Sequence, residues 1–72
     1  MDDLQIVGNA LETQWLQLRQ LMMDATDSAN RRLYAVGSRE LLLLAIKLIV
    51  DTQGRFSSCV PKMLDSGAFG GS

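Results

Sequence analysis

The side chains that could perform chemistry in this chain are one thiol and eight carboxylates, and no imidazole accompanies them. Cys59 is the only cysteine among 72 residues, and the sequence contains no histidine. Histidine is the commonest general base near neutral pH and the usual partner of a nucleophilic serine or cysteine. A zinc site would have to be built from carboxylates and a single thiolate. We therefore expect no metal site and no cofactor.

The carboxylates are spread along the chain. No two of them have a spacing that would bring them together in an apolar pocket, as catalysis by a pair of carboxylates requires. They are Asp2, Asp3, Glu12, Asp24, Asp27, Glu40, Asp51 and Asp65. The sequence therefore predicts a protein that is not an enzyme.

Cys59 lies beside a predicted helix N-terminus, a place where a thiol can become reactive. Nothing near it in sequence would make it catalytic, so we interpret it as an inert, half-buried apolar side chain. A lone cysteine fits a reducing compartment. The acidic start Met1-Asp2-Asp3 lacks the positive charge of a signal peptide. We expect the protein to be cytoplasmic.

The elements that position these groups are predicted to be helical. From Leu4 to Ala25 the apolar residues recur at alternating steps of three and four, which is one face of a helix. This pattern predicts a helix over residues 3–24, with Asp3 capping its first turn. Gly8 costs about 1 kcal/mol relative to alanine inside a helix. It marks either a close backbone approach or a frayed first turn.

A second helix is predicted over about residues 28–53, after a tight turn rich in capping residues and before Gly54. Gly37 leaves two alternatives, a continuous helix or two helices in line. The apolar phase passes through this glycine without a slip, which favours the continuous helix. A short helix is predicted over about 58–65, with Pro61 in its first turn. Residues 1–66 then form one domain, and residues 67–72 a flexible tail.

The run Leu41–Val50 is apolar on every side of a helix except at Lys47. A surface helix of a monomer keeps one polar face, and a membrane span needs about 20 apolar residues, more than this run contains. A chain of this length buries only about 60% of its unfolded surface, so it has little to cover the run with. We predict an all-α antiparallel helical hairpin with a short C-terminal helix, which assembles into a dimer resembling a four-helix bundle.

The expected oligomer interface is formed by apolar residues of both long helices. It comprises Leu41, Leu44, Ala45, Leu48, Ile49, Trp15, Leu18 and Met22. Two interpretations of Lys47 stay open. Its stem can lie along apolar neighbours while the ammonium reaches water, or the ammonium can bind a partner carboxylate across the interface.

A further surface is expected to bind another protein. Leu21 and Met23 widen the apolar stripe of the first helix, and Arg31 and Arg32 open the second. Methionine and arginine are both enriched at protein interfaces. The net charge of −1 and the few arginines disfavour nucleic acid as a partner.

In size and helical pattern the chain resembles small antirepressors and anti-activators of phages and bacteria, and equally the short helical chaperones of secretion systems. The first resemblance implies a non-enzymatic regulatory protein that oligomerises and blocks or sequesters another protein, such as a transcription regulator. The alternatives are a helical chaperone or assembly subunit of a larger complex, and a DNA-binding accessory protein. The expected partners are a second copy of the chain, as a dimer, and a different protein.

Overall fold

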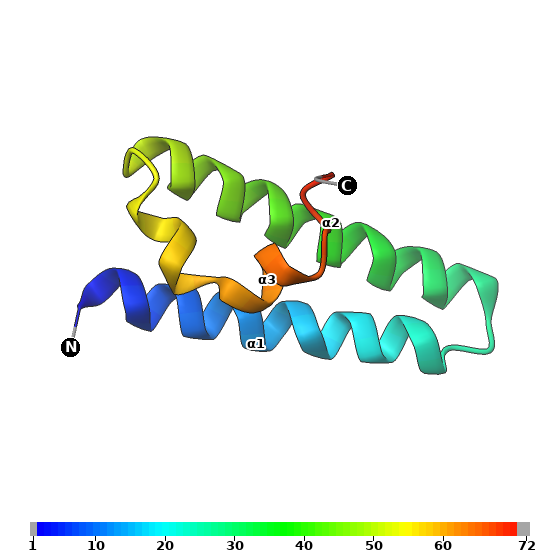
Figure 1. Ribbon diagram of the computed structural model, residues 1–72. Coiled ribbons are helices and arrows are strands. Elements are labelled where there is room, and N and C mark those ends of the chain that lie inside the picture. Colours follow the sequence, from blue (N-terminus) through cyan, green and yellow to red (C-terminus); the bar gives the residue numbers. More distant parts are fainter. Residues whose placement is uncertain (1, 71–72) are drawn as a thin grey trace.

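A computed structural model describes residues 2–70, and these residues contain helices and no strands. The two long helices are α1 (Asp3–Asp24) and α2 (Ser28–Asp51). The 3₁₀-helix η1 (Arg55–Cys59) and the short helix α3 (Pro61–Asp65) follow them. Figure 1 shows α1 and α2 running antiparallel, with the C-terminal elements returning along α1. The predicted all-α helical hairpin with a short C-terminal piece is confirmed.

Short-range capping bonds set the helix ends at the start of α1 and at the hairpin turn. Asp2, one residue before the predicted cap Asp3, accepts a hydrogen bond from the Leu4 amide at 3.2 Å. Asp27 caps α2 by accepting from the Asn30 amide at 3.3 Å. These bonds satisfy amide groups that a helix leaves without partners in its first turn.

Helix α2 is continuous through Gly37. A Cβ atom at this position would lie 3.3 Å from Cδ1 of Leu18, so the glycine lies directly against α1. The Ser38 hydroxyl donates to the Ala35 carbonyl at 2.9 Å and is buried. Ser38 therefore bonds within the helix and does not cap a new one.

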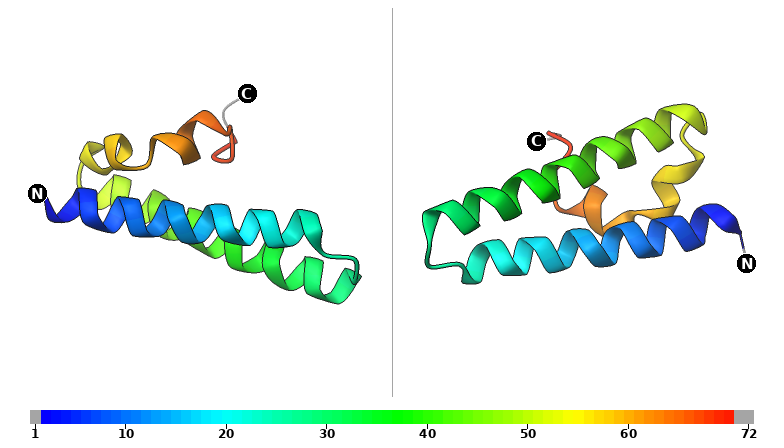
Figure 2. Two further views of the ribbon diagram at one scale, coloured as in Figure 1. Left: turned by 90° about the horizontal axis from the view of Figure 1, so that it is seen from below. Right: turned by 180° about the vertical axis from the view of Figure 1, so that it is seen from behind.

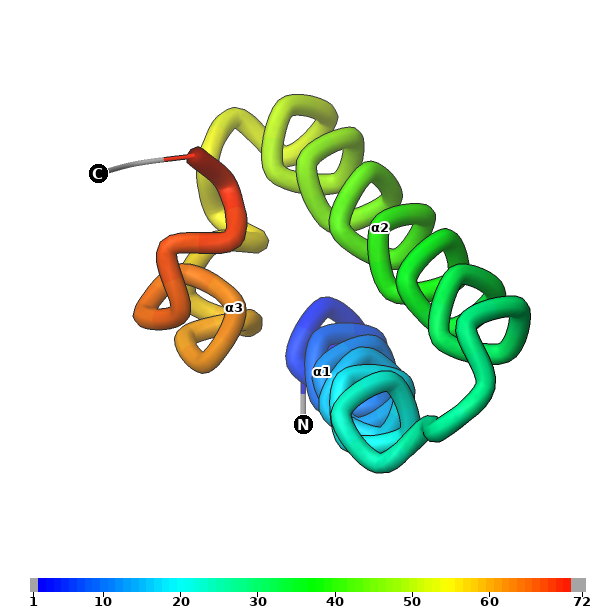
Figure 3. Tube along the Cα trace, turned by 90° about the vertical axis from the view of Figure 1, so that its right-hand side faces the viewer, coloured from blue at the N-terminus to red at the C-terminus, as the bar shows by residue number. Residues whose placement is uncertain are grey.

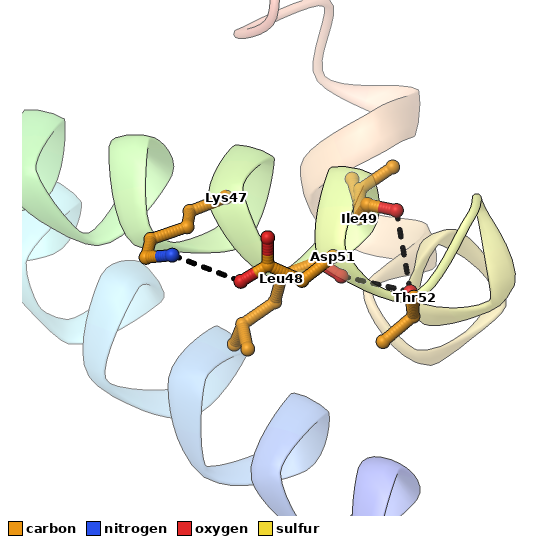
Figure 4. A network of polar contacts seen from close by, with 5 residues as sticks. All are labelled: Lys47, Leu48, Ile49, Asp51 and Thr52. Atoms are coloured by element: carbon orange, nitrogen blue, oxygen red, sulfur yellow. Dashed lines mark hydrogen bonds and ion pairs between the residues drawn. The ribbon is translucent and has the colours of Figure 1, made fainter.

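The end of α2 is built around Thr52 (Figure 4). Its hydroxyl donates to the Leu48 carbonyl at 2.7 Å and accepts from the Phe56 amide at 2.9 Å. Gly54 has φ 93°, a left-handed conformation typical of the residue that follows a helix. The helix ends at Asp51, two residues before the predicted boundary, and the chain reverses direction.

The C-terminal segment differs from the single helix predicted over residues 58–65. Residues Arg55–Cys59 form η1, and α3 begins only at Pro61. Val60 separates the two elements because its φ of −131° and ψ of 54° are not helical. Proline occupies the first turn of α3, where its missing amide hydrogen leaves no bond unmade.

The core lies between one face of the hairpin and the C-terminal segment. Figures 2 and 3 show this segment on one side of the hairpin, and no other part of residues 2–70 covers the opposite side. The molecule is accordingly flat, with extents of 39 × 27 × 17 Å. The buried apolar residues are Leu11, Trp15, Ala45, Phe56, Cys59, Val60 and Met63.

The chain after α3 is a series of turns up to residue 70. Phe69 is partly buried and packs against the core. The part of the predicted flexible tail at residues 71–72 lies outside the described residues. In the part of the chain that the structure describes, no helix is long and apolar enough to cross a membrane.

Candidate functional site

Glu12 is the most deeply placed carboxylate of the described chain, and its role is to cap α3. One oxygen, Oε2, accepts hydrogen bonds from the backbone amides of Lys62 at 2.6 Å and Met63 at 3.1 Å. A carboxylate at a helix N-terminus also interacts favourably with the helix dipole. Sequence reasoning missed this contact because the partners are 50 and 51 residues apart. The buried carboxylate of Glu12 thus binds backbone amides of the same chain and does not face a substrate site.

The thiol of Cys59 is buried in the core and not half-buried as expected. A Cβ atom on Gly8 would overlap the carbonyl oxygen and the Cβ of Cys59. The helix α1 and the C-terminal segment therefore meet backbone to backbone at this point. The close-approach interpretation of Gly8 holds, and the frayed-turn interpretation is wrong.

The described residues contain one ion pair, between Lys47 and Asp51 at 2.9 Å (Figure 4). Both side chains are exposed, so the pair contributes about 0.3–0.5 kcal/mol. Lys47 thus binds a carboxylate of its own helix. Among residues 2–70 no group of cysteine and carboxylate side chains is placed to hold a metal ion.

Two residues assigned to the oligomer interface lie in the core of the single chain. Trp15 and Ala45 are fully buried. Trp15 also has the Arg19 guanidinium carbon 4.8 Å from the centre of its ring. The assignment is corrected for these two residues, because the C-terminal segment returns over the hairpin and covers them.

The other predicted interface residues lie at the margin of the core. Figure 4 shows Leu48 directed toward α1. Leu44 is the only exposed residue of this set. Those that are partly buried are Leu18, Met22, Leu41, Leu48 and Ile49.

The four predicted partner-binding residues do not form one patch. Leu21 and Met23 are exposed but project about 160° apart around α1. Arg31 donates to the Ala25 carbonyl at 2.9 Å, and this bond fastens the end of α1 to the start of α2. Arg32 is exposed on the outer side of α2.

Eight of the twelve large apolar residues that are exposed among residues 2–70 lie on two surfaces of the hairpin. The first, which we call the open face, lies opposite the C-terminal segment and contains Val7, Leu21, Leu33 and Leu44. The second, which we call the outer stripe, runs along the side of α2 that points away from α1 and contains Val36, Leu43, Ile46 and Val50. The all-round apolar character of Leu41–Val50 was the sequence signal for most of the outer stripe and, on the open face, for Leu44 alone.

An open pocket of about 270 Å³ lies at the hairpin end of the open face. Leu21 from α1 and Tyr34 from α2 lie at its sides, and residues of the turn complete it. Its remaining lining residues are Asp24, Ala25, Thr26, Asp27 and Asn30. The pocket therefore combines an apolar wall with acidic groups.

Comparison of the chain with protein-family models, with curated proteins and with solved structures found no match.

Proposed function

We propose that this chain is a small non-enzymatic regulatory protein that self-associates and acts by binding and blocking, or sequestering, another protein. The observation that carries the proposal is the open face. Its apolar residues stay exposed although the chain has used its own C-terminal segment to cover the opposite face of the same hairpin. Large apolar side chains left exposed on one face of a small fold mark interaction sites.

The shape of the open face favours a helical partner. On the covered face of the hairpin, the chain's own helical segment η1–α3 packs against both long helices. The open face is formed by the same two helices, so an amphipathic helix of another protein fits it in the same manner. Leu21 and Leu33 provide apolar contacts there, one from each helix.

The experiment is a pull-down from the native host with the full chain as bait, followed by mass spectrometry. Leu21→Asp and Leu33→Asp each place a charge on the open face, where it would become buried under a partner helix. We expect both variants to lose the captured protein, because an unpaired charge in a dry interface is strongly unfavourable.

Leu64→Asp is the matched control, since Leu64 is 43% exposed and belongs to α3, on the opposite side of the hairpin. It adds the same charge away from the open face and is expected to keep the partner. Circular dichroism melting of all variants verifies that they are folded. Equal capture by the wild-type chain and by both open-face variants would contradict the proposal.

A further inference from the structure

The part of the open face that α2 contributes carries a carboxylate between its two leucines. Glu40 lies seven residues after Leu33 and four residues before Leu44, a spacing that places all three side chains on the same side of a helix. Glu40 is exposed and belongs to no ion pair in the part of the chain that the structure describes. Further along the same side of α2, Lys47 and Asp51 neutralise each other (Figure 4). The charge that is left over on this side of α2 is therefore negative.

The part of the open face that α1 contributes ends in a second carboxylate. Asp24 follows Leu21 by three residues, is exposed, and is the last residue of α1. Its oxygens accept hydrogen bonds from the neutral side-chain amide of Gln20 at 3.1 Å. A carboxylate at this position is unfavourable beside the negative end of the helix dipole, and the last turn of α1 contains no basic residue. A cation bound here would therefore be stabilised.

The pocket at the turn brings a third carboxylate to the same end of the open face. Asp24 and Asp27 both line it, beside the apolar surfaces of Leu21 and Tyr34. Neither aspartate belongs to an ion pair within residues 2–70. The pocket thus offers an apolar wall and two carboxylates, which suits a long basic side chain.

The arginines of the hairpin lie outside the open face. Arg32 and Arg39 project about 100–120° away from Leu33 around α2. Arg31 donates to a carbonyl of the turn, and Arg19 lies over the ring of a core residue. The open face consequently combines exposed apolar side chains with a net negative charge. Two copies of such a face would repel each other, so its charge disfavours a second copy of the chain as the occupant.

We propose that the partner helix on the open face is a basic amphipathic helix. Its apolar side contacts the leucines of α1 and α2, and one of its lysine or arginine side chains pairs with Glu40. A second basic side chain enters the pocket, where its stem lies along Leu21 and Tyr34 and its charge is neutralised by the two aspartates. This inference rests on the proposed function and names the chemical class of the partner.

The spacing along α2 predicts the pattern of such a helix. Leu33 and Leu44 are 11 residues apart, which is about 16 Å along the helix, and Glu40 lies between them. A partner helix that packs along the hairpin therefore presents two apolar positions about three turns apart, with a basic residue between them.

Two synthetic peptides test the charge of the partner. Both are amphipathic helices of about 18 residues, or five turns, with leucines at the same positions. The flanking residues are lysine in one peptide and glutamate in the other. In isothermal titration calorimetry we expect the full chain to bind the Leu/Lys peptide and not the Leu/Glu peptide. The affinity should fall as salt is added, because salt screens exposed charges.

Charge reversals on the open face test which carboxylates bind the peptide. We expect Asp24→Lys and Glu40→Lys each to weaken binding of the Leu/Lys peptide about tenfold. Asp24→Lys also places a cation at the end of α1, where it favours the helix, so a loss of binding does not come from unfolding. Asp65→Lys is the matched control, since Asp65 is likewise the exposed last residue of a helix, α3, on the opposite side of the hairpin. It should bind the peptide like the wild-type chain.

Neutral substitutions test where the peptide lies. Leu33→Gln removes an apolar contact from the open face, and Val36→Gln makes the same change on the outer stripe. The two side chains are 67% and 51% exposed, so the fold tolerates both changes. We expect Leu33→Gln to weaken binding of the Leu/Lys peptide and Val36→Gln to leave it unchanged.

Three results would overturn the inference. They are a Leu/Lys peptide that binds no better than the Leu/Glu peptide, unchanged affinity in both Asp24→Lys and Glu40→Lys, and an equal loss of binding in Val36→Gln and Leu33→Gln. A wild-type dimer that Leu33→Gln dissociates in sedimentation equilibrium would assign the open face to a second copy instead.

The protein captured from the native host separates this inference from the proposed function. A captured protein that is lost in Leu33→Asp but retained at wild-type level by Asp24→Lys and Glu40→Lys would uphold the proposed function and overturn the basic helix. Retention of that protein by both Leu21→Asp and Leu33→Asp would overturn the proposed function itself.

Discussion

At the scale of single residues, the polar groups of this chain that are removed from water serve the fold. Glu12 is buried and caps α3. Thr52 joins α2 to η1 through its hydroxyl group. In the described residues every buried side-chain nitrogen or oxygen atom has a hydrogen-bond partner. None of these groups is therefore held ready for a ligand.

The first residue-scale prediction concerns Glu12. Glu12→Ala leaves the amides of Lys62 and Met63 without their acceptor, and we expect a loss of about 1–3 kcal/mol in the free energy of unfolding. Glu12→Gln keeps an oxygen acceptor and should lose less. Urea denaturation followed by circular dichroism measures both. The exposed Gln17→Ala variant serves as control, and a Glu12→Ala chain as stable as this control would refute the capping role.

At the scale of elements, glycines decide how closely α1 approaches its neighbours. Gly8 allows the C-terminal segment to touch α1, and Gly37 allows α2 to lie against Leu18. The neighbours differ in kind. Cys59 presents its backbone to Gly8, whereas Leu18 presents the end of a flexible side chain to Gly37.

This difference predicts opposite effects of the same substitution. Gly8→Ala forces α1 and η1 apart, and we expect it to destabilise the fold by about 1–3 kcal/mol. Gly37→Ala meets a side chain that can move, and alanine favours the helix, so the variant should be neutral or more stable by up to about 1 kcal/mol. Thermal melting of the two variants beside the wild-type chain measures both changes in stability. A stabilising Gly8→Ala would mean that the contact with Cys59 is not maintained in solution.

At the scale of the whole molecule, stability depends on the C-terminal segment because it closes the only core that the described residues form. Phe56, Val60 and Met63 contribute three fully buried side chains to it. The core of a domain this small rarely provides more than about 3–5 kcal/mol. The free-energy cost of one large cavity in the core is about as large as that total.

The two phenylalanines provide the whole-molecule prediction. Phe56→Ala removes a fully buried ring, and such a change costs about 3–5 kcal/mol, so we expect the variant to be largely unfolded at 25 °C. Phe69→Ala removes a partly buried ring at the edge of the core and should leave a folded chain with a lower melting temperature. Circular dichroism and one-dimensional NMR spectra report the outcome. A cooperative, near-wild-type melting transition of Phe56→Ala would show that η1 does not anchor the fold.

The local part of the fold was predictable from the sequence. The spacing of apolar residues and the capping residues near Asp27 indicated two long helices and a tight turn, because helical hydrogen bonds and caps join residues only a few positions apart. The apolar spacing that continues through Gly37 indicated one unbroken helix, and this too depends only on residues a few positions apart. The apolar run Leu41–Val50 also showed that α2 carries more apolar surface than one neighbouring helix can cover.

Only the tertiary structure decided which apolar residues are core and which are surface. A helix that is apolar all round has no preferred face, so the path of the chain after Gly54 determines that Ala45 is buried and Val50 is exposed. The bond between Glu12 and α3 and the contact of Gly8 with Cys59 depend on the same return of the chain. These contacts join residues about fifty positions apart, and no periodicity along the sequence records them. The open face and the outer stripe follow from that choice, because they are the sides of the hairpin that the C-terminal segment does not cover.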